Sequence, residues 1–238
     1  MALARTCSVV YNMRLVHVLL TLPFCVSLSH TTTFQRIGPR IEFGGVWELS
    51  EPFAGVCADR AAAYLADPLR VLSAAWPAEN IEGPKPRPPG AAEEGVTYAL
   101  RQDPPITFAN LVTVDLDVDI EVRSEARGGI ALRSNSITSR ATLRNGQTRD
   151  VPMKFELTGA LHPQSTLPTA PAIIGGHFQY TTSVKLLGPL RLLPNGALRL
   201  AAKAVNDQLD LGGLFARGIA AKYPTWLEAQ ERGPAVER

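Results

Sequence analysis

The sequence predicts an α+β domain in which an antiparallel sheet of about six or seven strands is covered by a long C-terminal helix. Segments rich in β-branched and aromatic residues follow one another between residues 95 and 188, mostly separated by short turns. Helical periodicity occurs before these strands and again after them. Consecutive strands with short turns pair antiparallel, and the apolar face of such a sheet needs a helical cover.

Residues 1–42 are predicted to be a targeting leader that is cleaved or disordered. Arg14 precedes an apolar run over residues 15–28, which is the layout of a secretory signal peptide. Residues 31–40 are rich in hydroxyl groups, contain arginine and lack acids, which is typical of an organelle transit peptide. This order resembles the two-part leader of plastid proteins in algae with secondary plastids. We therefore expect a plastid location, with plain secretion as the alternative.

Composition and charge argue against several classes of protein. The chain is 45% hydrophobic and 19% charged, which is ordinary for a globular protein. Four of its 24 basic residues lie in residues 1–40, which hold no acid, so the rest of the chain is slightly acidic and nucleic-acid binding is not expected. No transmembrane segment is expected in the mature protein. Cys57 is the only cysteine beyond the leader, which fits a reducing compartment.

A single domain is predicted over residues 43–231, with a disordered tail over 232–238. It begins with a strand over 43–53 and a helix over 57–77. The helix is expected to stop and restart at Asp67 and Pro68, because Asp is a good N-cap and Pro at the first helical position needs no N–H. Residues 83–95 are rich in Pro and Gly and predict a surface loop.

The remaining elements are predicted as five strands and a C-terminal helix. The strands are expected over residues 95–102, 110–124, 128–143, 150–161 and 175–188. Asn145-Gly146 predicts a hairpin turn, because Asn and Gly tolerate positive φ.

Residues 194–211 carry an apolar stripe at helical spacing. We expect Gly212-Gly213 to interrupt this helix, which can resume over 214–230 with a further disturbance at Pro224.

Four acids alternate with aliphatic residues in the stretch TVDLDVDIEV, residues 113–122. These acids are Asp115, Asp117, Asp119 and Glu121. Same-face residues of a strand lie about 6.6–6.8 Å apart, so the row spans about 20 Å. One cation needs its oxygen ligands within about 2.0–2.6 Å. We therefore interpret the row as a solvated face and not as a metal site. Arg101, Arg133 and Arg140 are the expected cross-strand partners.

Other candidate chemistry is sparse. His162 and His177 have no neighbours at metal-ligand spacing, so neither a metal nor another cofactor is predicted. Cys57 opens a helix, where thiols can be reactive, but a small buried cysteine is the commoner explanation. The motifs of phosphate-binding loops, nucleophile elbows and zinc proteases do not occur in the sequence. No catalytic residue is predicted, and the sequence favours a protein that is not an enzyme.

Two patterns resemble known families. The order of strand, helix, antiparallel strands and long C-terminal helix is similar to the helix-grip fold of START-like, polyketide-cyclase-like lipid carriers. Locally, AAYLADPLRVLSAAWP (62–77), VKLLGPLRLLPNGALRLAAKAVNDQLDL (184–211) and YPTW (223–226) resemble an uncharacterised domain family of photosynthetic microbes and plastids. The resemblance covers about residues 43–230, and the loop at 83–95 departs from it. That family has no agreed activity, so it implies no catalytic residue.

The helix-grip resemblance implies an apolar ligand cavity between sheet and helix, with a packed core as the alternative. The expected lining residues are Val114, Leu116, Val118, Ile120, Met153, Phe155, Leu157, Phe178, Tyr180, Leu198, Val205 and Leu209. The predicted function is a non-enzymatic carrier of an apolar plastid metabolite, such as a lipid, pigment or quinone. The alternatives are a scaffold or assembly factor that docks a protein partner without a ligand, and thirdly a cyclase-type enzyme.

Overall fold

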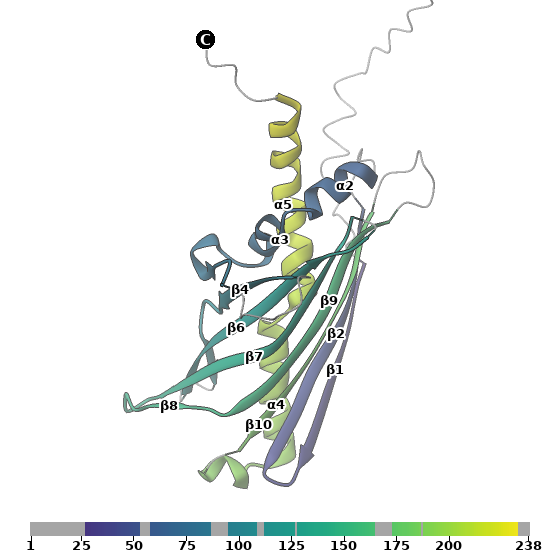
Figure 1. Cartoon of the computed structure of the whole chain (residues 1–238). Helices are drawn as coiled ribbons and strands as arrows, with labels where there is room; N and C mark the ends of the chain where they lie inside the picture. Colours follow the sequence, from purple (N-terminus) through teal and green to yellow (C-terminus); the bar gives the residue numbers. More distant parts are fainter. Residues whose placement is uncertain are drawn as a thin grey trace, which may run out of the picture.

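The computed structural model describes residues 27–52, 58–86, 95–108, 112–126, 128–164, 173–186 and 188–232. Within these residues a single ten-stranded antiparallel sheet curves around the C-terminal helices (Figure 1). The elements are β1 (Ser27–Ile37), β2 (Arg40–Pro52), α2 (Ala58–Leu65), α3 (Pro68–Ala75), the 3-10 helix η1 (Ala78–Asn80), β3 (Ile81–Glu82), β4 (Val96–Arg101), β5 (Ile106–Phe108), β6 (Val112–Ser124), β7 (Ile130–Leu143), β8 (Thr148–Asp150), β9 (Met153–Gln164), β10 (Ile173–Lys185), η2 (Gly188–Leu192), α4 (Asn195–Gln208) and α5 (Leu211–Arg232).

The strand order is β1-β2-β10-β9-β7-β6-β4-β3, with β5 also paired to β6 and β8 to β7. Neighbouring strands are antiparallel, as predicted. The sheet has more strands than the six or seven expected. Three of the additional strands, β3, β5 and β8, have only two or three residues. Such short strands leave too little alternation in the sequence to be recognised.

The fourth additional strand, β1, lies in the segment predicted to be a leader. It pairs with β2 along its whole length, from Ser27 opposite Ser50 to Ile37 opposite Arg40. The predicted domain start at residue 43 therefore falls inside β2. A threonine-rich, acid-free composition also suits a solvent-facing edge strand, which explains the misassignment. Residues 1–26 lie outside the described residues, and removal of a leader stays a prediction.

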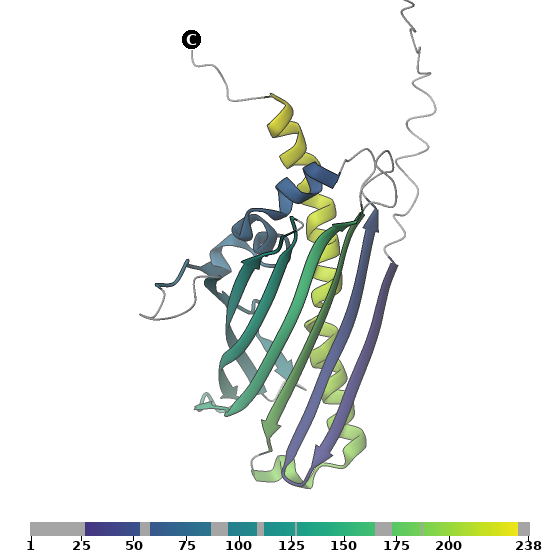
Figure 2. The same ribbon diagram turned by 45° about the vertical axis from the view of Figure 1, so that its right-hand side comes forward.

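Helices α4 and α5 run along the apolar inner face of the curved sheet (Figures 1 and 2). The Phe215 ring of α5 stacks on the Phe178 ring of β10, with centroids 4.8 Å apart. In the predicted α4 stripe, Leu198 and Val205 are buried and Leu209 is partly buried against the core. A curved antiparallel sheet that grips a long C-terminal helical segment is the helix-grip arrangement, so the predicted fold class is confirmed.

The restart of the first helix is confirmed at the predicted position. Asp67 Oδ1 accepts a hydrogen bond from the backbone N–H of Arg70 at 3.2 Å, and Pro68 is the first residue of α3. This pairing satisfies one of the N–H groups that a helix start leaves without an intrahelical partner.

The break in the C-terminal helix lies elsewhere than predicted. It falls at Leu209 and Asp210, whereas Gly212 and Gly213 belong to the first turn of α5. Asp210 Oδ1 accepts a hydrogen bond from Gly213 N at 3.0 Å and so caps α5. A Cβ on Gly213 would overlap the Asp210 carboxylate, so this glycine permits the close approach of the cap.

Helix α5 also continues through Pro224, where the sequence predicts a disturbance. Proline removes one backbone hydrogen bond from a helix interior and costs about 3 kcal/mol relative to alanine. Tyr223 and Trp226, which flank it, pack against Tyr64 of α2 with ring centroids 5.1 and 5.4 Å away. We attribute the continuity of the helix to this packing.

The hairpin turn at Asn145-Gly146 is confirmed. It joins β7 to β8, and Gly146 has a φ of 78°, in the region that glycine tolerates best. Cys57, residues 87–94 of the Pro-rich loop and residues 233–238 of the tail lie outside the described residues. Among the described helices, none is long and apolar enough to cross a membrane.

The contact between α3 and α5 gives a prediction for two glycines. A Cβ on Gly218 of α5 would overlap the Ala74 carbonyl of α3, whereas a Cβ on Gly196 of α4 would meet no atom within 4 Å. Alanine favours a helix over glycine by about 1 kcal/mol. Gly196→Ala should therefore raise the free energy of unfolding in urea by up to about 1 kcal/mol. Gly218→Ala should lower it, because α5 must move away from α3. Equal effects of the two changes would contradict this packing.

Candidate functional site

The acid row of β6 lies on the outer, solvated face of the sheet, as predicted. Side chains of Asp117, Asp119 and Glu121 are 49%, 37% and 32% exposed. The alternating residues Leu116 and Ile120 are buried. Among the described residues, no group of three or more His, Cys, Asp or Glu side chains is arranged to hold a metal ion.

Of the three predicted arginine partners, one forms the expected ion pair. Arg101 Nε lies 3.2 Å from Asp117 Oδ1. Arg133 and Arg140 lie opposite Glu121 and Asp115 in the β6–β7 register. Arg140, however, pairs with Asp150 of β8 at 3.7 Å. The sequence could not indicate this partner because β8 was not recognised as a strand.

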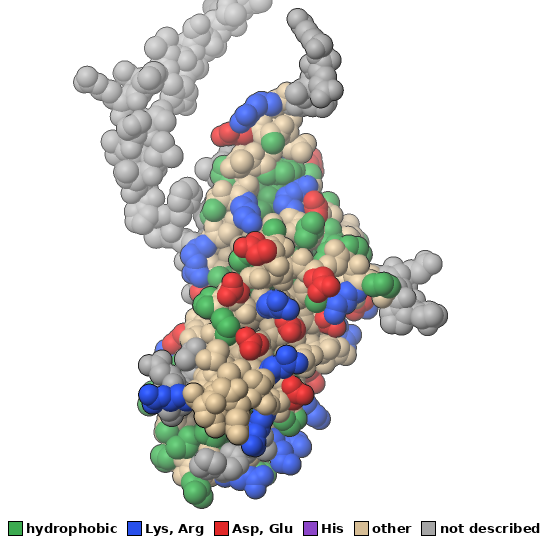
Figure 3. Space-filling model, turned by 90° about the vertical axis from the view of Figure 1, so that its left-hand side faces the viewer, with side chains coloured by type: hydrophobic (Ala, Val, Ile, Leu, Met, Phe, Trp, Pro, Cys, Tyr) green, Lys and Arg blue, Asp and Glu red, His purple; other side chains and the backbone are tan. Residues whose placement is uncertain are grey.

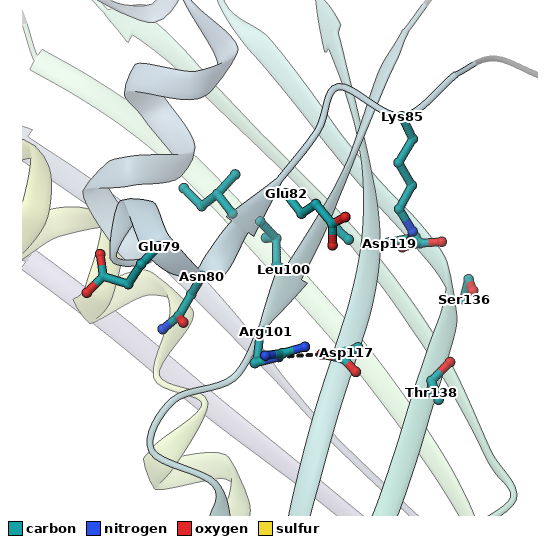
Figure 4. Close-up of a pocket in the computed structure, with 12 residues that line it drawn as sticks. Glu79, Asn80, Glu82, Lys85, Leu100, Arg101, Asp117, Asp119, Ser136 and Thr138 are labelled. Atoms are coloured by element: carbon teal, nitrogen blue, oxygen red, sulfur yellow. Dashed lines mark hydrogen bonds and ion pairs between the residues drawn. The ribbon is translucent and has the colours of Figure 1, made fainter.

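A half-open hollow of about 450 Å³ lies on the same outer face, beside η1 and the edge strand β3 (Figure 4). Its floor comes from two cross-strand rows, Arg101–Asp117–Thr138 and Ala99–Asp119–Ser136. Lys85 Nζ lies 2.5 Å from Asp119 Oδ1. Both cations of the hollow are thus already paired with carboxylates.

The described lining of this hollow offers no activated nucleophile. Ser136 and Thr138 contribute hydroxyl groups, but neither hydroxyl is hydrogen-bonded to a carboxylate among the described residues, and the described lining contains no histidine or cysteine. A hydroxyl needs an adjacent general base to become a nucleophile. Glu79 and Glu82 add negative charge at the rim, which favours solvation over the binding of an apolar molecule.

The predicted lining of the ligand cavity lies on the opposite, inner face of the sheet. All twelve residues belong to the hydrophobic core or pack against it. Nine of them are buried, and the exceptions, Val118, Met153 and Leu209, are partly buried. The structure therefore brings the strand residues and the helix residues of this set together in one interior. That they contact a ligand stays a prediction.

A polar connection crosses this apolar interior and was missed from the sequence. The Tyr180 hydroxyl of β10 donates to Asn206 Oδ1 of α4, and Asn206 Nδ2 donates to the Gly44 carbonyl of β2 at 3.2 Å. Asn206 is 1% exposed. Burial raises the pKa of Tyr180 above its ordinary value of 10.0, with a smaller contribution from Asp207, so the hydroxyl stays protonated.

One sequence signal could have located this connection. Asn206 lies four residues after Ala202 and eight after Leu198, which places it on the buried stripe of α4. Glycines inside a strand often mark a close backbone approach. At Gly44, a Cβ would overlap the Tyr180 carbonyl oxygen, so the adjacent strands require glycine there.

Trp47 of β2 lies beside this connection. Its ring is fully buried and stacks on Tyr180, with centroids 5.3 Å apart. The ring occupies the space over Gly45, where a Cβ would lie 2.6 Å from an indole carbon. Trp47 Nε1 is buried and has no hydrogen-bond partner among the described residues. An unpaired buried donor loses its bonds to water without replacement, and Trp226 Nε1, in the aromatic cluster at the other end of α5, is likewise buried without a partner among the described residues.

Two of the three segments that carry the family resemblance, residues 62–77 and 223–226, meet in the C-terminal half of α5. Tyr64 of the first segment contacts both Tyr223 and Trp226 of the second. The Arg70 guanidinium lies 5.0 Å from the centroid of the Trp226 ring, a cation–π contact. Burial raises the pKa of Tyr64 to about 12, and the positive charge of the nearby Arg70 limits this rise. This cluster joins the N-terminal helices to the C-terminal helix.

His162 and His177, the histidines considered in the sequence, lie on neighbouring strands but outside any such cluster. His162 Nε2 lies 2.8 Å from Gln164 Nε2, and His177 is exposed on β10. These positions give no further candidate chemistry.

Comparisons with known proteins add little to this geometry. No protein-family model matches the chain, and no curated protein matches it. Similar solved structures include the Zhui aromatase/cyclase of Streptomyces sp. R1128, at 12% identity and a TM-score of 0.42 over 88% of this chain and 98% of that one. A STAR-related lipid transfer protein fragment of Xanthomonas axonopodis has 16% identity and a TM-score of 0.32 over 77% and 96% of the two chains.

A conserved protein of Geobacillus kaustophilus has 14% identity and a TM-score of 0.35, over 75% of this chain and 95% of that one. At such identities and scores these similarities carry no argument about ligand or activity. The fold assignment rests on the strand order and on the helical cover of the sheet.

The exposure of the acid row gives a prediction for Asp117. Exposed ion pairs contribute little, so Asp117→Asn should change the free energy of unfolding by less than about 0.5 kcal/mol. Magnesium or calcium should shift the melting temperature of the wild type and the variant equally. A cation-dependent stabilisation that the variant loses would show that the row is a metal site.

Proposed function

We propose that the chain is a non-enzymatic carrier that holds an apolar small molecule between the sheet and helices α4 and α5. The observation that carries the proposal is the buried, unpaired Trp47 Nε1 inside an aromatic and aliphatic interior. Binding sites for small apolar ligands are mostly hydrophobic and contain a few polar groups that orient the ligand. A ligand oxygen that accepts from this indole N–H would remove the cost of burying it unpaired.

The chemistry of the interior narrows the ligand class. Phe155, Phe178 and Tyr180 present aromatic rings from adjacent strands, which suits a flat or extended hydrocarbon. The Tyr180 hydroxyl already donates a hydrogen bond to Asn206. In this region of the described structure, Trp47 Nε1 is therefore the donor that has no hydrogen-bond partner. The proposed ligand is therefore apolar with one hydrogen-bond acceptor, as in a lipid, pigment or quinone.

We also propose that the carrier acts in a plastid. Support comes from the apolar run that follows Arg14 and from Cys57, the single cysteine beyond the predicted leader. Because β1 begins at Ser27, a cleavage before that residue would leave the described fold complete.

The ligand proposal predicts retention of an apolar molecule during purification. Native mass spectrometry of the full chain, purified from a photosynthetic host, should show protein with a bound small molecule. Trp47→Phe should reduce the bound fraction, because it removes the donor but keeps an aromatic ring. Trp226→Phe is the matched control, because it removes another buried indole N–H from the distant aromatic cluster. Wild-type protein without any adduct would contradict the carrier proposal and favour a scaffold that docks a protein partner.

The location is tested by a fluorescent reporter fused to residues 1–45 and expressed in an alga with a secondary plastid. We expect fluorescence inside the plastid. Reporter in the medium, with none in the plastid, would instead indicate secretion.

A further inference from the structure

Exposed large hydrophobic side chains gather at one end of the molecule. Of the seven such residues among those described, five lie around η2, the start of α4 and the β1–β2 turn: Ile37, Leu190, Leu192, Leu193 and Leu200. Leu192 is 87% exposed and Leu200 is 70% exposed. Single exposed leucines are ordinary, but a group of them on one surface indicates an interaction site.

Hydrogen bonds hold this surface in place. Arg36 of β1 donates to the carbonyl oxygens of Arg191 and Leu193 at 2.6 and 2.9 Å, and to Asn195 Oδ1 at 3.1 Å. The backbone N–H of Leu186 donates to the Pro39 carbonyl at 2.8 Å. The leucines of η2 are therefore fixed against the β1–β2 turn, and their exposure is a property of the folded state.

The segments at this end carry positive charge, and the nearest acid along the chain is Glu42 of β2. Residues 34–41 and 184–200 contain five cations and no Asp or Glu. The cations are Arg36, Arg40, Lys185, Arg191 and Arg199. No ion pair to any of them occurs among the described residues. Figure 3 shows hydrophobic and basic side chains at the lower end of the molecule, whereas acids and bases mix in its middle.

We propose that this basic, leucine-bearing end docks onto an anionic lipid bilayer. Leucines that enter the boundary between headgroups and acyl chains leave water, while Arg and Lys remain at the level of the anionic headgroups. Either signal alone gives weak binding, and the combination gives a stable peripheral contact.

The charge of the surface favours a bilayer over a second copy of the chain. In a symmetric dimer the five cations would face the same five cations of the partner, which disfavours association. The docking inference does not depend on the proposed ligand, because both the leucines and the cations lie outside the interior.

Vesicle flotation of the full chain tests the inference. Vesicles made of equal parts phosphatidylcholine and phosphatidylglycerol should carry the wild-type protein to the top of the gradient at low salt. Pure phosphatidylcholine, or high salt with the mixed vesicles, should carry much less, because the attraction between cations and anionic headgroups is lost or screened. The doubly substituted Leu192→Ser, Leu200→Ser protein should bind the mixed vesicles about tenfold more weakly.

Matched controls separate this surface from the rest of the chain. Leu69→Ser changes an exposed leucine on α3 and should leave flotation unchanged. Arg40→Glu with Lys185→Glu should reduce flotation, whereas Arg144→Glu with Arg149→Glu, the same charge change on the β7–β8 hairpin, should not. Residues 1–26 are common to all these proteins, so differences report on the surface.

Two results would overturn the inference. One is equal flotation of the wild type and the Leu192→Ser, Leu200→Ser protein. The other is a concentration-dependent dimer in the wild type that these two changes abolish, which would assign the surface to a second copy. Ligand retention, measured separately, is expected to be unchanged in these variants, so failure of docking and failure of the carrier proposal are distinguishable.

Discussion

The structure depends on the contact between the apolar inner face of the sheet and the helices that cover it. An antiparallel sheet with alternating side chains leaves one face apolar, and that face is stable only if another layer removes it from water. Helices α4 and α5 supply this layer through Phe215 and the α4 stripe. Within it, Asn206 fixes where α4 lies by bonding to two strands at once. A buried polar group with satisfied partners specifies one arrangement of an otherwise non-directional apolar contact.

The two faces of the sheet therefore have different roles. On the outer face, the acids of β6 keep the sheet solvated, and the two cations of the hollow beside them already pair with carboxylates. The inner face holds the aromatic interior on which the carrier proposal rests. The end formed by η2 and the β1–β2 turn has neither character, since it exposes leucines beside cations that form no ion pair with the described residues. Solvation, the proposed ligand site and the proposed membrane contact thus fall on separate parts of one fold.

The sequence predicted the parts of the fold that local chemistry determines. Alternation in β6 assigned its two faces, the α4 stripe predicted the helical cover, and Asp67-Pro68 predicted a helix restart. Each of these signals lies within one element and needs no knowledge of its neighbours. The lining residues were placed in the core for the same reason, because burial follows from periodicity.

The remaining features depend on contacts between distant segments. An edge strand and a transit peptide share a threonine-rich composition, so only pairing with β2 could identify β1. Asp210 can be recognised as a helix cap only when the first residue of α5 is known. Pro224 is tolerated inside α5 because its neighbours pack on Tyr64. Trp47 and Asn206 are ordinary residues in the sequence. Asn206 has its hydrogen-bond partners 26 and 162 residues away, at Tyr180 and Gly44, and the described residues provide no partner for the Trp47 N–H.

The most direct test of the account is a double-mutant cycle between Tyr180 and Asn206. The free energy of unfolding would be measured for Tyr180→Phe, Asn206→Leu and the double variant. If α4 lies against β10 as described, the two changes should be coupled by about 1 kcal/mol or more, because either one removes the same buried hydrogen bond. Additive effects would mean that these side chains do not meet, and that α4 does not cover the sheet in this position.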